Sequence, residues 1–193
     1  MSDVSVVITC CNRPELLKQT FDSLVKFNTY PIDKYVVIED SGLQNCNDFL
    51  ISDYPNLPIR LIYNEKNIGQ LPSIDKAYAE VTTPYIFHCE EDWEFYKEGF
   101  IEGSFGLLEI PSIYQCWLRE DGDLNGHPIE ESVIEGRKVR LTKNQRTDGD
   151  NHWKGFSLNP HLVKVENYLK MAKYSELNNE LDLNKRFYKL GFR

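Results

Sequence analysis

The stretch that decides the fold is Val-Ser-Val-Val-Ile-Thr-Cys-Cys-Asn-Arg-Pro, residues 4–14. Its first part, residues 4–10, is short, β-branched and almost continuously apolar, which is typical of a strand buried on both faces. Asn12 then offers a helix N-cap, and Pro14 suits the first helical position. Apolar residues follow at helical spacing: Leu16, Leu17, Phe21, Leu24 and Val25. The stretch therefore predicts a buried strand that leads directly into a helix.

The same alternation continues through the first half of the chain. Further buried strands are predicted over residues 35–38, 59–63 and 85–89, and a helix over residues 72–80. Strands that alternate with helices at this spacing imply right-handed crossovers and a parallel sheet covered on both faces. In such sheets ligands bind beyond the carboxyl ends of the strands. We therefore predict an α/β fold whose functional groups lie in four segments: residues 11–13, 39–41, 64–70 and 90–92.

The second half of the chain is less regular. Its pattern predicts strands over residues 112–118 and 137–141, polar loops over residues 121–126 and 147–154, a helix that opens at Asn159-Pro160, and a last helix over residues 175–190. The chain contains no repeat, linker or low-complexity tract, so the sequence predicts one domain.

The charge balance excludes one class of partner and leaves another open. The chain has 22 Lys and Arg against 30 Asp and Glu, a net charge of −8, which argues against binding nucleic acid through a basic surface. The charge is divided, because residues 1–135 hold 9 basic and 24 acidic groups, whereas residues 136–193 hold 13 and 6. An acidic body with a basic last third would suit an anionic ligand held between them; merely uneven surface charge is the alternative.

Targeting and redox signals favour the cytoplasm. No apolar run is long enough to cross a bilayer, and the first residues have neither the basic nor the apolar region of a signal peptide. Five cysteines are an odd number, and reduced thiols fit better than a disulfide framework. We expect a cytoplasmic protein without a transmembrane segment.

Several motifs of well-known sites are missing. No G-x-G-x-x-G follows the first strand, which disfavours a dinucleotide site, and there is no P-loop signature. The chain also lacks H-E-x-x-H, C-x-x-C and G-x-S-x-G. The chemistry must therefore come from other residues.

The acidic triplet Glu90-Glu91-Asp92 follows a predicted buried strand. Three consecutive carboxylates repel one another unless something neutralises them, and oxygen ligands of this kind suit Mg²⁺, Mn²⁺ or Ca²⁺. The alternative is a solvated acidic loop, because further glutamates follow at positions 94, 98 and 102.

Three other positions have both a functional and a structural interpretation. Glu39 and Asp40 could accept hydrogen bonds from a ribose hydroxyl or a base N–H; a local turn in which Asp40 bonds its own backbone is the alternative. Arg13, at a strand–helix junction, could bind a diphosphate or be a surface arginine. His152, in a polar loop, is a candidate metal ligand or phosphate contact.

Taken together, five segments resemble the motifs of family 2 inverting glycosyltransferases, in the same order. Residues 4–17 resemble the opening strand and its N-R-P-like turn, and residues 36–42 the second strand and its acidic turn. Residues 67–75 resemble the N-x-G segment, with Asp75 in place of the usual Asn. Residues 90–92 stand where the family has its D-x-D metal motif, with Glu in the first position. Residues 179–192 resemble the E-D-x-D-L helix near the C-terminus.

The resemblance implies a GT-A fold: a single domain over residues 1–193, with a nucleotide-binding half (1–92) and an acceptor and catalytic half (93–193). It implies transfer of a hexose from a nucleotide-diphosphate sugar, most commonly a UDP-sugar, to a hydroxyl of a carbohydrate acceptor, with inversion and with Mn²⁺ or Mg²⁺. Glu180 occupies the position of the general base, and the expected metal ligands are Glu90, Asp92 and His152. The expected nucleotide-sugar contacts are Thr9, Cys11, Asn12, Arg13, Glu39, Asp40, Asn67, Gly69, Asp75, Glu91 and Trp153.

Two tryptophans and two rival functions complete these expectations. Trp153 and Trp117 are candidates to stack on sugar faces, with ordinary packing as the alternative. One rival is a sugar nucleotidyltransferase, but the Gly-rich basic loop of that class does not follow the first strand. The other rival is a noncatalytic module that binds sugars or nucleotides.

Overall fold

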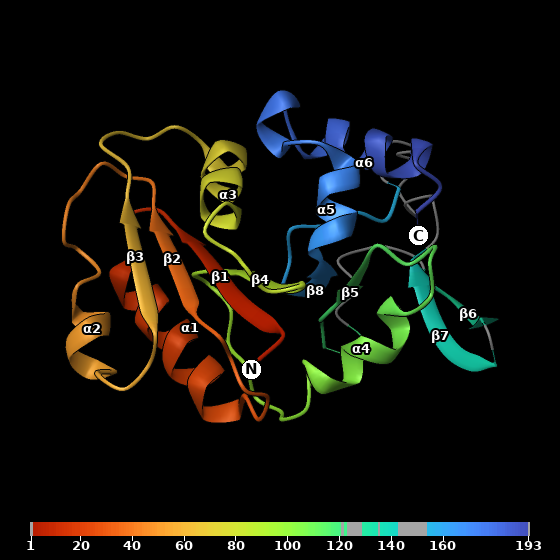
Figure 1. Ribbon diagram of the computed structural model, residues 1–193, viewed down its shortest axis with the longest axis horizontal. Helices are drawn as coiled ribbons and strands as arrows, with labels where there is room; N and C mark the ends of the chain where they lie inside the picture. The colour runs from red at the N-terminus through yellow and green to blue at the C-terminus, as the bar shows by residue number, and fades with distance from the viewer. Residues whose placement is uncertain (1, 121, 123–128, 135, 143–153, 193) are drawn as a thin grey trace.

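A six-stranded sheet forms the centre of the computed structural model, which describes residues 2–120, 122, 129–134, 136–142 and 154–192 (Figure 1). The strand order is β3-β2-β1-β4-β8-β5. The four strands β1 to β4 are parallel, β8 runs antiparallel to β4, and β5 runs antiparallel to β8. The strands are β1 (Val4–Cys10), β2 (Tyr35–Glu39), β3 (Ile59–Tyr63), β4 (Tyr85–Glu90), β5 (Gln115–Trp117) and β8 (His161–Lys164). The predicted mostly parallel α/β sheet is confirmed.

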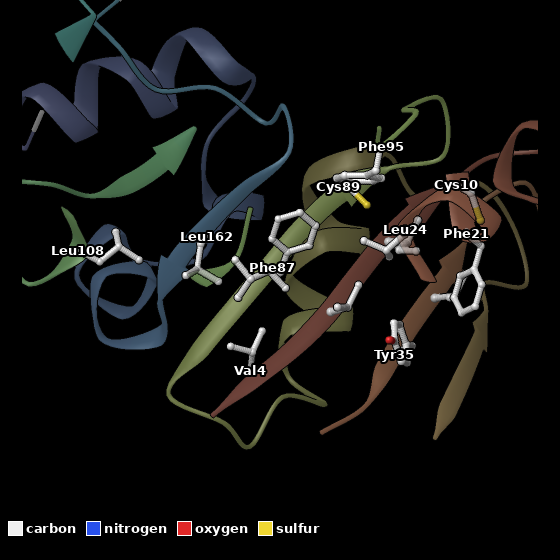
Figure 2. Packing of buried hydrophobic residues seen from close by; sticks show 14 of the residues in the cluster. Val4, Cys10, Phe21, Leu24, Tyr35, Phe87, Cys89, Phe95, Leu108 and Leu162 are labelled. Atoms are coloured by element: carbon white, nitrogen blue, oxygen red, sulfur yellow. The ribbon is translucent and has the colours of Figure 1, made fainter. Parts of the chain in front are cut away.

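Helices cover both faces of this sheet. Residues of α1, α2 and α4 share one hydrophobic core with β1, β2 and β4, and Figure 2 shows Phe21 and Leu24 of α1 in this core with Tyr35 and Phe87. Residues of α3, α5 and α6 share a second core on the opposite face. The helices are α1 (Pro14–Phe27), α2 (Phe49–Asp53), α3 (Gln70–Tyr78), α4 (Glu102–Leu108), α5 (Val165–Met171), the 3₁₀ turn η1 (Tyr174–Glu176) and α6 (Glu180–Lys189).

The opening stretch folds largely as its sequence predicts. All seven residues of β1 are buried, and Pro14 lies in the first turn of α1. The predicted N-cap is wrong, because Arg13 occupies that position and makes no capping hydrogen bond with its side chain. Asn12 instead adopts a left-handed conformation with φ of 55°, and its backbone N–H donates to Glu39 Oε1 at 2.9 Å.

The second half contains the main corrections. The helix predicted to open at Asn159-Pro160 is instead strand β8, whose His161, Leu162 and Val163 are buried between β4 and β5, and α5 begins only at Val165. The single helix predicted over residues 175–190 is divided into η1 and α6. Asn179 caps α6 by accepting from the Asp182 N–H at 3.1 Å, which fixes the start of the helix.

A two-stranded sheet of β6 (Ile129–Ile134) and β7 (Arg137–Thr142) stands beside the main sheet (Figure 1). Val139 and Leu141 are buried while Lys138 and Arg140 are exposed, so the alternation predicted for this strand is confirmed. The five cysteines carry free thiols. Among the helices of the described ranges, none combines the length and apolarity required to cross a membrane.

The topology creates one switch point. From β1 the chain goes on to β2 on one side, and it later returns to β4 on the other side of β1. In open α/β sheets the crevice at such a reversal, beyond the carboxyl ends of the strands, is the usual ligand site. Thr9 pairs in register with Glu90 there, so the predicted segments that follow β1 and β4 lie side by side.

Candidate functional site

A pocket of about 350 Å³ opens at the switch point. Thr9, Cys11 and Arg13 reach it from the end of β1, Asp40 from the end of β2, Asn67 and Gly69 from the loop before α3, and Glu90 and Glu91 from the end of β4. The structure therefore brings together most of the residues that the sequence nominated, from four segments that are distant in the chain.

Glu39 stabilises the loops at this pocket through hydrogen bonds. Its buried carboxylate accepts from the N–H groups of Asn12 (2.9 Å) and Ser41 (2.8 Å) with one oxygen, and from the Asn47 amide (3.0 Å) with the other. Burial alone would raise the pKa of Glu39, but these hydrogen bonds from Ser41, Asn12 and Asn47 outweigh it and lower the pKa. Glu39 is not among the lining residues, so its observed role is to hold the loops that line the site.

Asp40 holds in place the loop before α3, which forms one wall of the pocket. Its Oδ1 accepts from the Asn64 amide and the Ile68 N–H, both at 2.8 Å, and its Oδ2 accepts from the Gly69 N–H at 2.9 Å. The alternative of a local turn is therefore not what the structure shows, because these backbone partners lie 28 and 29 residues further along the chain. Gly69 has φ of 95°, a conformation that favours glycine at this close approach.

Arg13 spans the crevice to the acidic triplet. Its guanidinium contacts Glu91 Oε1 at 2.7 Å and Asp92 Oδ2 at 3.1 Å, and the Cys11 N–H donates to the same Glu91 oxygen at 3.2 Å. Thr20 Oγ1 donates to the Glu91 carbonyl at 2.6 Å. The buried Glu91 thus ties the end of β1 to the end of β4, while Arg13 remains about half exposed and lines the pocket.

Glu90 is the carboxylate of the triplet that is left without this arginine contact. Burial, together with the negative charges of Asp92, Glu91 and Glu180, raises the pKa of Glu90 to about 7, and Arg13 only partly opposes the rise. Gln70 donates a hydrogen bond to Glu90 from the first turn of α3. Glu180 is thus one of the charges that raise the pKa of Glu90, although 90 residues separate the two glutamates in the chain.

Glu180 is the first residue of α6 and is accessible to water. Protein nevertheless surrounds the carboxylate closely enough that desolvation raises its pKa, and a hydrogen bond from the Leu158 backbone opposes the rise. A carboxylate with a raised pKa is a better proton acceptor for a hydroxyl group than an ordinary one. Its environment is therefore compatible with general-base chemistry.

The other predicted residues divide into two groups. Asp75 does not line the pocket. It accepts from the Tyr168 hydroxyl (2.7 Å) and from the N–H groups of Tyr174 (3.0 Å) and Ser175 (2.8 Å), so it anchors η1 to α3. His152 and Trp153 lie outside the described residues.

Three lining residues were not among the predicted contacts: Cys10, Gln70 and Ser73, of which Gln70 lies at the end of the predicted segment 64–70. Gln70 and Ser73 complete the pocket wall from the first turn of α3. Their position directly after the Asn67-Ile68-Gly69 segment is the signal that could have identified them, because a helix that follows such a loop at a strand end presents its first turn to the crevice.

Divalent-metal binding can be tested against the donor set. No cluster of three or more His, Cys, Asp or Glu side chains suited to a metal ion occurs within the described part of the chain. Mg²⁺ is typically held by one or two carboxylates, with phosphates and waters as its remaining ligands. Glu90 and Asp92 fit that pattern: burial is the main cause of the raised pKa of Glu90, and the neighbouring charges of Asp92 and Glu91, which add to it, are ones that a cation would offset.

Comparison with family models and with curated sequences finds matches to glycosyltransferases. The family model described as Glycosyl transferase family 2 matches residues 5–158. A curated relative, "Uncharacterized glycosyltransferase YwdF" of Bacillus subtilis, is 28% identical over 99 residues, which are 51% of this chain and 35% of the relative. The matched region thus spans about a third of that relative's length.

Comparison with solved structures confirms the fold as GT-A type. Staphylococcus aureus TarS (residues 1–349) superposes with a TM-score of 0.61 and 14% identity over 97% of this chain and 55% of TarS. A mannosyltransferase of Pyrobaculum calidifontis, in complex with GDP-Man and Mn²⁺, gives a TM-score of 0.55 and 16% identity over 62% of this chain and 36% of its own. TarS in complex with UDP-GlcNAc superposes with a TM-score of 0.51 and 16% identity, over 70% of this chain and 38% of TarS.

Proposed function

The chain belongs to glycosyl transferase family 2, and from that premise we propose that it transfers a sugar from a nucleoside-diphosphate donor to a carbohydrate hydroxyl, with inversion. The single observation that carries the proposal is the pocket at the switch point, where Arg13, Asp40, Glu90 and Glu91 converge from the ends of β1, β2 and β4. In this proposal Glu90 and Asp92, in the triplet that follows β4, act near the leaving diphosphate, and Glu180, the first residue of α6, acts near the acceptor.

The donor half of the site is residues 1–92 in this proposal. The diphosphate and ribose enter the pocket between the ends of β1 and β4, against the wall that Asp40 holds through the Ile68 and Gly69 N–H groups. UDP-sugars are the first donors to test, and the named complexes of similar structures with UDP-GlcNAc and GDP-Man support a nucleotide sugar of either base.

Glu180 takes the acceptor proton in the proposed reaction. The acceptor oxygen forms a bond to the anomeric carbon while the bond from that carbon to the diphosphate oxygen breaks, and the electron pair leaves with the nucleoside diphosphate. Because this is a single displacement, the anomeric configuration inverts and no second carboxylate nucleophile is required.

Glu90 and Asp92 are the residues that would hold a divalent cation. When bound, Mn²⁺ or Mg²⁺ would supply Lewis-acid neutralisation of the departing diphosphate. Arg13 keeps Glu91 and Asp92 in place from the other side of the crevice. The five free thiols fit a reducing compartment, and we propose a cytoplasmic location for this site.

The test combines donor binding with turnover. Calorimetry with UDP-GlcNAc, UDP-glucose and GDP-mannose, each with Mn²⁺ or Mg²⁺ and with EDTA, identifies the donor, and release of the nucleotide measures transfer or hydrolysis. Glu180→Gln should bind the donor like the wild type and turn it over about 10²- to 10⁴-fold more slowly. Asp92→Ala should lose the metal-dependent part of donor affinity.

Two outcomes would count against the proposal. If wild type and Glu180→Gln release nucleotide at the same rate, Glu180 is not the base. If the donor binds tightly but neither protein turns it over with any acceptor or with water, the chain is a binding module, the alternative from a different functional class. Asp182→Asn is the matched control, because Asp182 is an acid of the same helix whose carboxylate contacts Asn178 and Lys185.

A further inference from the structure

Gln70 and Glu90 meet across the donor pocket, which is the pocket at the switch point. Gln70 lines this pocket from the first turn of α3, and Glu90 lines it from the end of β4. The Gln70 amide donates a hydrogen bond from Nε2 to Glu90 Oε1. Among the described residues Gln70 is the side chain that bonds this carboxylate, so the contact links the helix to the acidic triplet.

The start of α3 is held in place by hydrogen bonds that begin at Asp40. Asp40 accepts from the Gly69 N–H at 2.9 Å, immediately before Gln70 in the chain. The Asn64 amide donates both to Asp40 at 2.8 Å and to the Ser73 hydroxyl at 3.0 Å. The backbone on either side of Gln70 is thus tied to the ends of β2 and β3, which fixes the point from which its side chain extends.

The backbone of Glu90 is fixed as well, because Glu90 is the last residue of β4 and pairs in register with Thr9 of β1. Its side chain still has three rotatable bonds, and ordering such a side chain costs conformational entropy. A hydrogen bond that already holds one carboxylate oxygen lowers the entropy that is lost when a ligand binds the other oxygen. The Gln70 amide provides this hydrogen bond on Oε1.

We propose that Gln70 is a positioning residue for the divalent-cation site, and that its amide holds Glu90 Oε1 so that Oε2 serves the cation. Carboxylates that bind metals are themselves hydrogen-bonded by neighbouring groups, and loss of such a partner costs about 10- to 100-fold in metal affinity. Gln70 acts through Glu90, because its amide N–H group is the part that faces the carboxylate. The inference rests on the proposed function, which assigns the cation to Glu90 and Asp92.

The test measures how strongly Mn²⁺ supports nucleotide binding. Calorimetric titration with UDP, over a series of Mn²⁺ concentrations and in EDTA, gives the Mn²⁺ concentration at which half of the metal-dependent UDP affinity is present. Gln70→Met keeps the length of the side chain but removes the donor, and it should raise this half-effect concentration about tenfold. A merely structural role would instead lower the UDP affinity in EDTA and the melting temperature, and leave the half-effect concentration unchanged.

Thr29→Val is the matched control for the loss of a side-chain donor. The Thr29 hydroxyl is exposed and donates to Glu102 Oε1 at 2.7 Å, and neither residue lines the donor pocket. Its replacement by a side chain of the same shape should therefore leave the half-effect concentration as in the wild type.

Glu90→Asp keeps a carboxylate but shortens the side chain by one methylene, which withdraws it from the Gln70 amide. In this background Gln70→Met should raise the half-effect concentration less than about twofold, because the hydrogen bond that it removes is already lost. The inference is overturned if Gln70→Met has no effect in the wild-type background, or if its effect is equal in both backgrounds.

A failure of the proposed function appears in the wild type alone. If Mn²⁺ changes the affinity of the wild type for neither UDP nor GDP, the cation site itself is refuted, and the role of Gln70 is refuted with it. If Mn²⁺ strengthens nucleotide binding by the wild type but Gln70→Met responds to Mn²⁺ in the same way, the cation site stands and the role of Gln70 alone is refuted.

Discussion

Two stacked histidines in the core give a prediction with a definite sign. His88 of β4 and His161 of β8 face each other in register, are fully buried, and have ring centres 5.2 Å apart. Burial, with the nearby His161, holds the pKa of His88 well below its ordinary value of 6.5, and burial lowers the pKa of His161 to about 4. Both nitrogens of His88 are without a hydrogen-bond partner among the described residues.

The size of the expected stability change follows from the difference in histidine protonation between the unfolded and the folded state. Between pH 6.5 and 5 the unfolded chain protonates each histidine, whereas the folded protein keeps His88 neutral, so stability is lost as the pH falls. Each pH unit corresponds to about 1.4 kcal/mol, and an interval of about 1.5 units costs about 2 kcal/mol for His88. Glu90, whose pKa is raised to about 7, contributes with the opposite sign, so the comparison must be between variants and not along one curve.

The assay is urea unfolding of the wild type and His88→Leu at pH 8 and pH 5. At pH 8 we expect similar stability, because the substitution removes two buried nitrogens that have no partner. At pH 5 we expect His88→Leu to gain about 2 kcal/mol relative to the wild type. Tyr78→Phe is the control, since it removes a neighbouring buried hydroxyl that also lacks a described partner but does not titrate in this range. If the two variants show the same change between pH 8 and pH 5, His88 is not held neutral and the reasoning fails.

Further predictions separate residues that hold the donor pocket from residues that hold the fold. Asp40→Ala should lower the free energy of unfolding by about 2–4 kcal/mol and also weaken nucleotide binding, because it releases the Ile68 and Gly69 N–H groups beside the pocket. Asp75→Ala should have a similar effect on urea unfolding, but calorimetry should show unchanged nucleotide affinity, since its partners lie on η1. Arg13→Gln should raise the pKa of Glu90 above about 7, because the guanidinium is the cation that lowers it; NMR titration of labelled glutamate side chains tests this.

The parallel half of the sheet could be predicted because its signals are local. Each strand is a short apolar run, and parallel strands place their carboxyl ends at one edge, so the proximity of residues 11–13 and 90–92 follows from topology alone. The strand β8 and its position between β4 and β5 could not be predicted in this way. His161–Lys164 becomes a strand because β4 and β5 bury it from both sides, which is a non-local cause that outweighs local sequence preference.

The roles of individual acids were less accessible to sequence reasoning. Asp40 and Asp75 are both acids in segments that resemble donor contacts, yet one organises the pocket wall and the other a helix junction on a different part of the protein. Their partners lie between 24 and 100 residues away in the sequence. Such distances leave no periodic signal in the chain, so only the folded structure assigns the two roles.

The charge of the donor pocket leads to a last conclusion about how a diphosphate is bound. Among the pocket's lining residues the sole cationic side chain is Arg13, and it already contacts Glu91 and Asp92. A diphosphate that entered this pocket without further positive charge would face Glu90 and Asp40 as well, and the repulsion would oppose binding. Positive charge must therefore arrive with the ligand or from the basic residues 136–193, which hold 13 basic and 6 acidic groups. A comparison of nucleotide affinity with Mn²⁺ and with EDTA distinguishes the two sources. If a metal ion brings the charge, the affinity depends on the metal; if residues 136–193 bring it, the affinity does not.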